Sequence, residues 1–198
     1  MGYTHYWYRE REITPELYDK IVEDFKSLLP TFKVLDVKLG DGLGENSPVL
    51  DTENVFFNGL SKCGHKANAS IVIPWPADKT KFGSAPSSDQ ALVGSWFAGA
   101  LLDQRTCNGD CSYETFALPR VFSTDGYFSQ NDEGRYFAFC KTAFRPYDLA
   151  VTTFLVIAKH YLGDKIDVSS DGEMQHWIDA VMMCETAFGY GNDFRLQN

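Results

Sequence analysis

The chain has 198 residues, of which 15% are aromatic and 23% are charged. This length is enough to bury a substantial core in one domain, and the composition is typical of a globular protein. The formal net charge of −9 argues against nucleic acid and anionic membrane surfaces as main partners, because both attract concentrated Lys and Arg.

Two absences in the sequence indicate where the protein works. No apolar run is long enough to span a bilayer, and residues 1–12 lack the basic and then apolar order of a secretory signal. We therefore expect a cytoplasmic protein. There the five cysteines, an odd number, favour reduced thiols or a metal site over a disulfide framework.

The N-terminal part of the chain predicts a strand, a helix and a second strand. Residues 3–9 alternate with aromatic side chains on both faces, as in a strand that is covered on both sides. Thr14 and Pro15 then begin an amphipathic helix that Pro30 ends. A strand is expected over 32–39.

The middle of the chain predicts an insertion or lid over residues 77–110. A polar stretch there precedes a helix predicted over 90–102, with Ser88 or Asp89 as its cap. Short apolar runs bounded by turn residues predict strands on both sides of this region, over 55–57, 70–73, 113–118, 121–122 and 135–139.

The clearest helix in the sequence is expected over 146–162. Pro146 suits its first position and Gly163 the position just past its end. Almost no polar face remains between them, which is typical of a helix buried on most sides against a sheet. A strand follows over 166–169, and Ser170 or Asp171 then caps a last helix.

The order of these elements predicts the fold class. Strands occur in consecutive runs rather than in strict alternation with helices. This order favours an α+β fold with a mixed, mostly antiparallel sheet and helices packed on it, as a single domain over 1–198. A doubly wound sheet is the alternative.

Two basic residues precede the buried helix and predict an anion site. Lys141 and Arg145 lie before its start, where free N–H groups and the helix dipole favour negative charge, and Thr142 adds a hydroxyl. Ser170 and Asp171 stand at the second such helix start. The alternative is structural, with the polar residues as helix caps and the two cations paired with carboxylates.

Two Cys/His pairs suggest a metal site. Cys63 and His65 form one pair and Cys107 and Cys111 the other, each on a turn that contains glycine. Together they could supply the four ligands of a tetrahedral zinc, which would be structural because no position stays open. The alternative is two ordinary loops with unrelated thiols, since the spacings are looser than those of common zinc modules.

Enzyme motifs give little support for a particular reaction. The sequence holds no Gly-x-Ser-x-Gly elbow and no zinc-deaminase motif. An acid–base set of His5, Glu114 and Asp171 requires the fold to bring these residues together.

Four blocks of the sequence resemble a known family. They are MGYTHYWYR at the start, ETFALPR over 114–120, FCKTAFRPYD over 139–148 and IDVSSDG over 166–172. Together they resemble the shared blocks of an uncharacterised family of bacterial and bacteriophage proteins. The resemblance does not extend to residues 60–110. It implies an origin in phages or their hosts and supplies no activity.

The first functional hypothesis is a protein that binds a phosphorylated, nucleotide-type small molecule. With the phage resemblance, such a protein would sequester a nucleotide signal of host defence. The ligand would contact polar side chains and stack on aromatic ones, namely Lys141, Thr142, Arg145, Ser170 and Asp171 with Tyr6, Trp7 or Tyr147.

Two alternatives stay open. One is a hydrolase of phosphate esters or glycosidic bonds, with Glu114 or Asp171 as acid or base. The other is a protein-binding inhibitor whose acidic surface docks a basic partner. The sequence does not indicate the oligomeric state.

Overall fold

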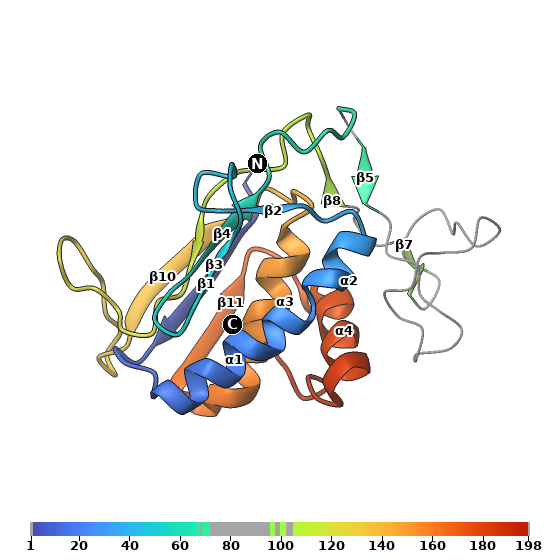
Figure 1. Cartoon of the computed structure of the whole chain (residues 1–198). Helices are drawn as coiled ribbons and strands as arrows, with labels where there is room; N and C mark the ends of the chain where they lie inside the picture. The colour runs from blue at the N-terminus through green and yellow to red at the C-terminus, as the bar shows by residue number, and fades with distance from the viewer. Residues whose placement is uncertain (1, 68, 72–95, 98–99, 102–104, 198) are drawn as a thin grey trace.

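The main sheet has three antiparallel strands with the N-terminal strand in the middle. The computed structural model describes residues 2–67, 69–71, 96–97, 100–101 and 105–197 (Figure 1). Strand β1 (Thr4–Arg9) pairs with β10 (Tyr136–Lys141) on one side and β11 (Ile166–Ser170) on the other. The first strand and the last two strands predicted from the sequence thus form one sheet.

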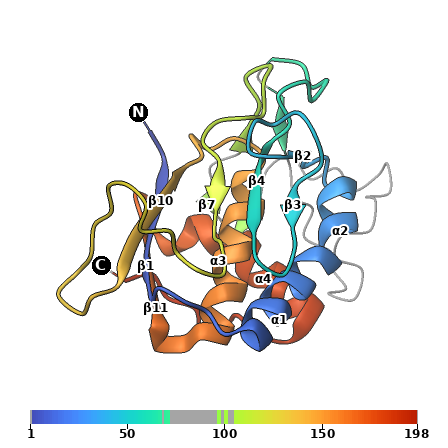
Figure 2. The same ribbon diagram turned by 60° about the vertical axis from the view of Figure 1, so that its left-hand side comes forward.

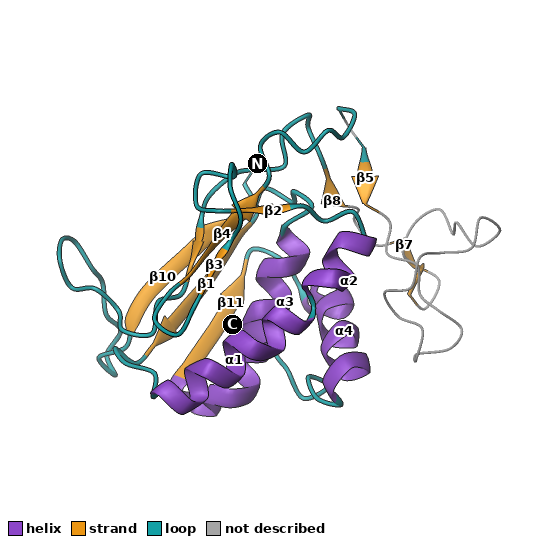
Figure 3. Cartoon of the chain, in the orientation of Figure 1, coloured by secondary structure: helices purple, strands orange, loops and turns teal. Residues whose placement is uncertain are grey.

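The helices gather on one side of this sheet (Figure 3). They comprise α1 (Pro15–Ser27), α2 (Leu29–Val34), α3 (Asp148–Leu162) and α4 (Ile178–Phe188), with short 3-10 helices η2 (Gly163–Lys165) and η3 (Met174–Trp177). Helix α3 packs against α1, α4 and β11, and its residues 148–158 are all buried. Its nearly all-apolar surface explains this central position.

A second sheet stands beside the first (Figure 2). Its central strand β4 (Val55–Gly59) pairs in antiparallel fashion with β2 (Leu39–Gly40), β3 (Val49–Leu50) and β9 (Phe116–Ala117). Two further pairs belong to the predicted insertion and its border, β5 (Ser70–Ile71) with β8 (Arg105–Thr106) and β6 (Trp96–Phe97) with β7 (Ala100–Leu101).

One aromatic cluster joins the helices to the second sheet. Phe154 of α3 lies with its ring centroid 5.0 Å from that of Phe25 in α1 and 5.1 Å from that of Phe116 in β9. Phe57 of β4 stacks on Phe25 at 5.2 Å. All four rings are fully buried, so both sheets share one core with α3 at its centre.

The structure confirms the predicted α+β class with antiparallel sheets and corrects three elements. The strand predicted over 32–39 is wrong at its start, because residues 29–34 form α2. Pro30 sits in the first turn of that helix, where no backbone N–H is needed, so it does not end the helical region. Phe32 is buried against Phe25, and this apolar contact favours the helical turn.

The helix predicted over 90–102 is the second correction. Its described residues, 96–97 and 100–101, are extended and pair with each other, and the remainder lies outside the described residues. The third concerns the cap of the last helix. Glu173 forms a capping box with His176 at the start of η3, whereas Ser170 belongs to β11. The single domain over 1–198 and the lid role of 77–110 stay predictions.

The position of α3 leads to a first prediction. Phe154→Ala should lower the free energy of unfolding by about 3–5 kcal/mol, because it opens a cavity among buried rings. Phe139→Ala is the matched control, since Phe139 is 53% exposed and its loss should change stability by about 1 kcal/mol or less. Urea denaturation of both variants measures the difference. Equal losses would contradict the central place of α3 in the core.

Candidate functional site

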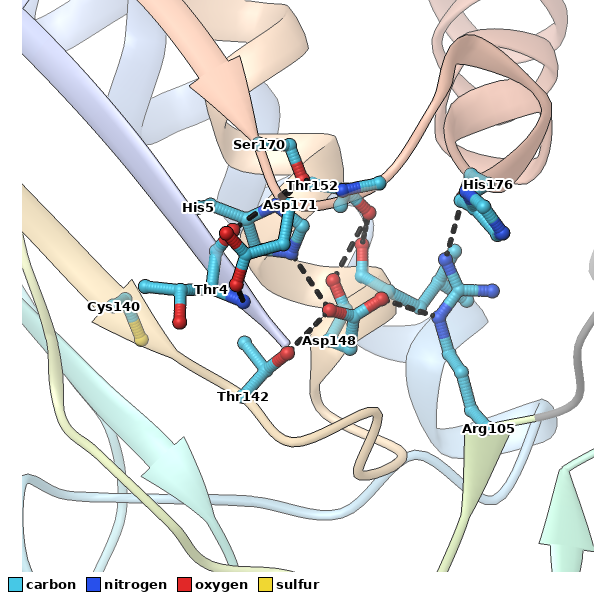
Figure 4. A network of polar contacts seen from close by, with 12 residues as sticks. Thr4, His5, Arg105, Cys140, Thr142, Asp148, Thr152, Ser170, Asp171 and His176 are labelled. Atoms are coloured by element: carbon cyan, nitrogen blue, oxygen red, sulfur yellow. Dashed lines mark hydrogen bonds and ion pairs between the residues drawn. The ribbon is translucent and has the colours of Figure 1, made fainter. Parts of the chain in front are cut away.

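Residues from three distant parts of the chain meet at the end of the sheet where β1 begins. The strand register places His5 of β1 opposite Ser170 of β11 and opposite Cys140 of β10. The connection from β10 to α3 then brings Asp148, the first residue of α3, to His5 (Figure 4).

His5 joins Ser170 to Asp148 through its two ring nitrogens (Figure 4). Nε2 lies 2.7 Å from Asp148 Oδ1, and Nδ1 lies 3.0 Å from Ser170 Oγ. His5 and Asp148 are fully buried, whereas Ser170 is partly exposed. A hydroxyl, an imidazole and a carboxylate are therefore in hydrogen-bond contact, with the hydroxyl nearest the solvent.

The groups around Asp148 keep it ionised. Arg105 Nε donates to Oδ2 at 2.8 Å, and Thr142 Oγ1 donates to Oδ1 at 2.6 Å. Burial by itself would raise the pKa of Asp148, but Arg105, then His5 and Thr142, lower it to about 2. At neutral pH this carboxylate accepts hydrogen bonds and donates none.

The ionised carboxylate fixes the tautomer of His5. Because Asp148 can only accept, the proton between them belongs to His5 Nε2. In neutral imidazole the other nitrogen, Nδ1, then carries a lone pair and accepts the hydroxyl proton of Ser170. His5 Nδ1, at 3.0 Å, is the nearer of two acceptors for the Ser170 hydroxyl, since the Thr4 carbonyl lies at 3.4 Å.

Arg105 lies between two buried carboxylates. The residue is 3% exposed, and its Nη1 donates to Asp179 Oδ2 at 2.8 Å while Nε contacts Asp148. Burial raises the pKa of Asp179, and Arg105 offsets part of this effect. We call His5, Arg105, Thr142, Asp148, Ser170 and Asp179 the buried polar network.

The connection between β10 and α3 has a strained backbone. Ala143 and Phe144 have φ angles of 50° and 56°, which residues other than glycine rarely adopt. Two contacts with Tyr3 hold this conformation: its carbonyl accepts from the Ala143 N–H at 3.1 Å, and its ring lies 4.1 Å from that of Phe144. Backbone strain of this kind is concentrated at functional sites.

The residues predicted to bind an anion divide between the two faces of the main sheet. Successive side chains of a strand alternate, so Ser170 faces α3 while Lys141, Tyr6 and Asp171 face away from it. On that outer face Asp171 Oδ1 accepts a hydrogen bond from the Tyr6 hydroxyl at 3.0 Å. The sheet therefore separates these residues from Ser170.

The start of α3 does not present free amides to an anion. The N–H groups of residues 148–150 donate to the carbonyls of Arg145, Pro146 and Tyr147, at 2.9, 3.4 and 2.9 Å. The Arg145 side chain is partly exposed and forms no ion pair with any other described residue. The Arg145 guanidinium is therefore available to a ligand.

Two aromatic residues predicted as ligand walls lie in the interior. Trp7 is 1% exposed and packs on the ring of Phe116. Tyr147 is fully buried, and its hydroxyl donates to the carbonyl of Glu114 at 2.7 Å. The prediction that these rings line a site is wrong, because neither reaches the surface.

The acid–base set predicted from His5, Glu114 and Asp171 is not assembled. Glu114 Oε2 accepts from the backbone N–H of Lys141 at 2.7 Å, and Asp171 Oδ2 accepts from the backbone N–H of Thr4 at 3.0 Å. His5 instead contacts Asp148 and Ser170. Asp148 lies within the helix predicted over 146–162, but no sequence pattern connects it with His5.

The sequence patterns did not single out Arg105 or Asp179. Asp179 carried a signal, because an acidic residue among the apolar side chains of a helix must find a buried partner. Arg105 carried none, since it lies in the polar region that predicted an insertion. Its importance appears only when β8 is placed beside α3.

The two predicted Cys/His pairs come together, and the cluster could hold a metal ion. The ligand atoms of Cys63, His65, Cys107 and Cys111 all lie within 4.8 Å of one another. Cys63 Sγ is 3.6 Å from Cys107 Sγ, and His65 Nδ1 is 3.1 Å from Cys111 Sγ. The other nitrogen of His65 contacts Asp36 Oδ2 at 2.9 Å, and carboxylates commonly make this contact with the free nitrogen of a histidine that binds a metal.

The ionisation of Asp148 predicts a pH window of stability. Its folded pKa lies below the ordinary 3.8, so its contribution is complete above about pH 4 and is lost as the pH falls toward 2. The lowered pKa of Asp148 corresponds to about 2 kcal/mol of folding free energy. Urea denaturation between pH 5 and pH 2, as approximate limits, should therefore show a shallower pH dependence for Asp148→Asn than for the native chain. The same dependence in both would contradict an ionised Asp148.

Among the described residues, no helix has both the length and the apolarity that a membrane crossing needs.

Comparisons with known proteins identified no relative of this chain. The bacterial and bacteriophage family suggested by the four sequence blocks stays a prediction. Neither protein-family models, nor curated proteins, nor solved structures gave a match to this chain.

Proposed function

We propose that the protein is an ester hydrolase in which Ser170 is the nucleophile. The observation that carries the proposal is the hydrogen-bonded row of Ser170, His5 and Asp148, with distances of 3.0 and 2.7 Å. A nucleophile within reach of a base that a third group orients is the general arrangement of nucleophilic catalysis. It recurs on unrelated folds and is recognised by geometry rather than by sequence position.

Each residue of the row has a defined role in the proposed reaction. Ser170 Oγ attacks the electrophilic centre of the ester while its proton passes to His5 Nδ1. His5 then gives this proton to the departing alcohol oxygen, which leaves a covalent intermediate on Ser170. A water molecule cleaves the intermediate, loses its proton to Nδ1 and restores the serine. Asp148 stays ionised and stabilises the imidazolium.

Arg145, three residues before Asp148 in the chain, favours a phosphate ester as the substrate class. Arg145 forms no ion pair with another described residue, although the chain has a surplus of carboxylates. A guanidinium recognises phosphate through two parallel hydrogen bonds. Glycosidic bonds are less well supported, because they need two available carboxyl groups and those of Asp148 and Asp171 are already engaged.

Binding without chemistry is the second candidate, and Arg145 is the observation that favours it. A nucleotide-type ligand held for sequestration would return unchanged after incubation. A hydrolase substrate would return as alcohol and phosphate. Mass spectrometry of the released ligand therefore separates the two proposals.

Ser170 can be tested with a fluorophosphonate, which reacts with activated serines whatever the natural substrate. The native protein should be labelled at Ser170, and His5→Gln should slow the labelling by about 10²-fold or more, because the base is lost. Peptide mass spectrometry identifies the labelled residue, and hydrolysis of 4-nitrophenyl phosphate measures turnover.

Ser169→Ala is the matched control for Ser170→Ala. Both serines belong to β11, but Ser169 faces away from His5. Ser170→Ala should abolish labelling and Ser169→Ala should leave it intact. Equal labelling of the native chain and Ser170→Ala would rule out Ser170 as the nucleophile.

We also propose that the Cys/His cluster binds a structural zinc ion. Sulfur ligands about 2.3 Å from a tetrahedral zinc lie about 3.8 Å apart, which is close to the 3.6 Å between the Sγ atoms of Cys63 and Cys107. Three thiolates and one imidazole fill all four positions, so the ion would stabilise the fold rather than bind a substrate.

The zinc proposal predicts metal content. The purified protein should carry about one zinc per chain by elemental analysis, and Cys111→Ala should lose it, because three ligands bind less tightly. Cys184→Ala is the control, since Cys184 is a buried thiol of α4 outside the cluster. A native chain without zinc, or full zinc in Cys111→Ala, would contradict the proposal.

A further inference from the structure

We propose that the metal cluster positions Arg105, so that metal occupancy decides whether His5 is aligned on Ser170. The inference rests on the proposed zinc and goes beyond it, because it assigns the ion a role in the buried polar network. Arg105 acts here as a positioning residue, since it touches Asp148 and not the reacting hydroxyl.

The buried polar network and the Cys/His cluster are close together along the chain. Arg105 lies in β8 and the ligand Cys107 follows two residues later. In an extended chain two residues span about 7 Å, so a fixed Cys107 confines the backbone of Arg105. A single short segment thus carries one metal ligand and the cation of the network.

Backbone hydrogen bonds also hold this segment. β8 pairs with the two residues of β5, the Thr106 N–H donates to the Phe144 carbonyl at 3.0 Å, and the Cys107 N–H donates to the Ala69 carbonyl at 2.8 Å. The thiols of Cys63, Cys107 and Cys111 form a small apolar cluster with Leu60 and Ala69, separate from the main core. A bound zinc would hold Cys107 more strongly than these hydrogen bonds do, because the free energy of binding a structural zinc becomes free energy of folding.

This segment also brings the positive charge of Arg105 into the interior. Arg105 places one guanidinium against Asp148 and Asp179, both buried, at 2.8 Å each. Without it these carboxylates would face each other in the interior without a counter-charge, and one of them would take up a proton or turn to water.

Asp148 and His5 connect Arg105 with the Ser170 hydroxyl. Asp148 orients His5 only while it is an ionised acceptor held in place, with Oδ2 on Arg105 and Oδ1 on His5. When Arg105 leaves, Asp148 loses one of the groups that fix it, and the His5 ring loses its defined tautomer. Metal loss at the cluster therefore reaches Ser170 through Arg105 and Asp148.

The test observes the hydrogen bond between His5 and Asp148 directly. In the zinc-loaded protein with ¹⁵N-labelled histidine, the buried Nε2–H of His5 should give a downfield proton signal that is protected from exchange. Chelation of the zinc should remove this signal, and added zinc should restore it. A chelated, folded chain that keeps the signal at full intensity would overturn the inference.

Arg105→Met supplies a second, independent perturbation. It removes the charge at similar side-chain length, and the variant should lose the His5 signal even with zinc bound. Lys66→Met is the matched control, since Lys66 is an exposed cation of the same region outside the network, and it should keep the signal. If chelation unfolds the chain, Arg105→Met decides alone: a retained signal overturns the inference.

The zinc proposal and this inference fail in different ways. A chain that takes up no zinc overturns both. A chain that binds zinc but keeps the His5 signal after chelation, or in Arg105→Met, overturns the positioning role and leaves the structural zinc intact. Neither result depends on Ser170 being a nucleophile, because the readout is the His5 proton.

Discussion

The buried ion pair between Arg105 and Asp148 is the interaction on which the site depends. Asp148 begins the most buried helix of the protein, where an unpaired carboxylate would be strongly destabilising. Arg105 keeps it ionised, and Asp179 shares the same guanidinium. An ionised Asp148 in turn keeps the His5 proton on Nε2, and His5 Nδ1 then accepts from the Ser170 hydroxyl. Removal of Arg105 would therefore affect Asp148, then His5 and then Ser170.

The rest of the fold makes this arrangement possible. α3 is buried by an aromatic core that both sheets share, so the position of its first residue is fixed. β1 lies in the middle of the main sheet, so His5 is held between two neighbouring strands. The strained turn at Ala143 and Phe144 then directs the chain from the end of β10 into α3. Rigid elements on three sides hold the ring of His5 in one orientation.

The buried polar network and the Cys/His cluster meet in one short segment of the chain. Arg105 and Cys107 are two residues apart, and one enters the polar network while the other enters the Cys/His cluster. The second nitrogen of His65 contacts Asp36, whose φ of 59° shows that this loop too has an unusual backbone. The two sites are therefore neighbours through the chain although their ligands come from different loops.

The sequence by itself determined the α+β class, the first strand, the central helix and the membership of the Cys/His cluster. These features depend on local patterns: alternation in β1, a continuous apolar surface in α3, and thiols and an imidazole on turns. Sequence patterns misplaced Trp7 and Tyr147, because an aromatic residue looks the same whether it lines a site or fills a core. Only the tertiary structure decided that Lys141 and Asp171 lie across the sheet from Ser170, and that Arg105 pairs with Asp148, the carboxylate that contacts His5. Strand register and the hydrogen bonds of Arg105 to Asp148 and Asp179 set these positions, and both arise from contacts between residues far apart in the chain.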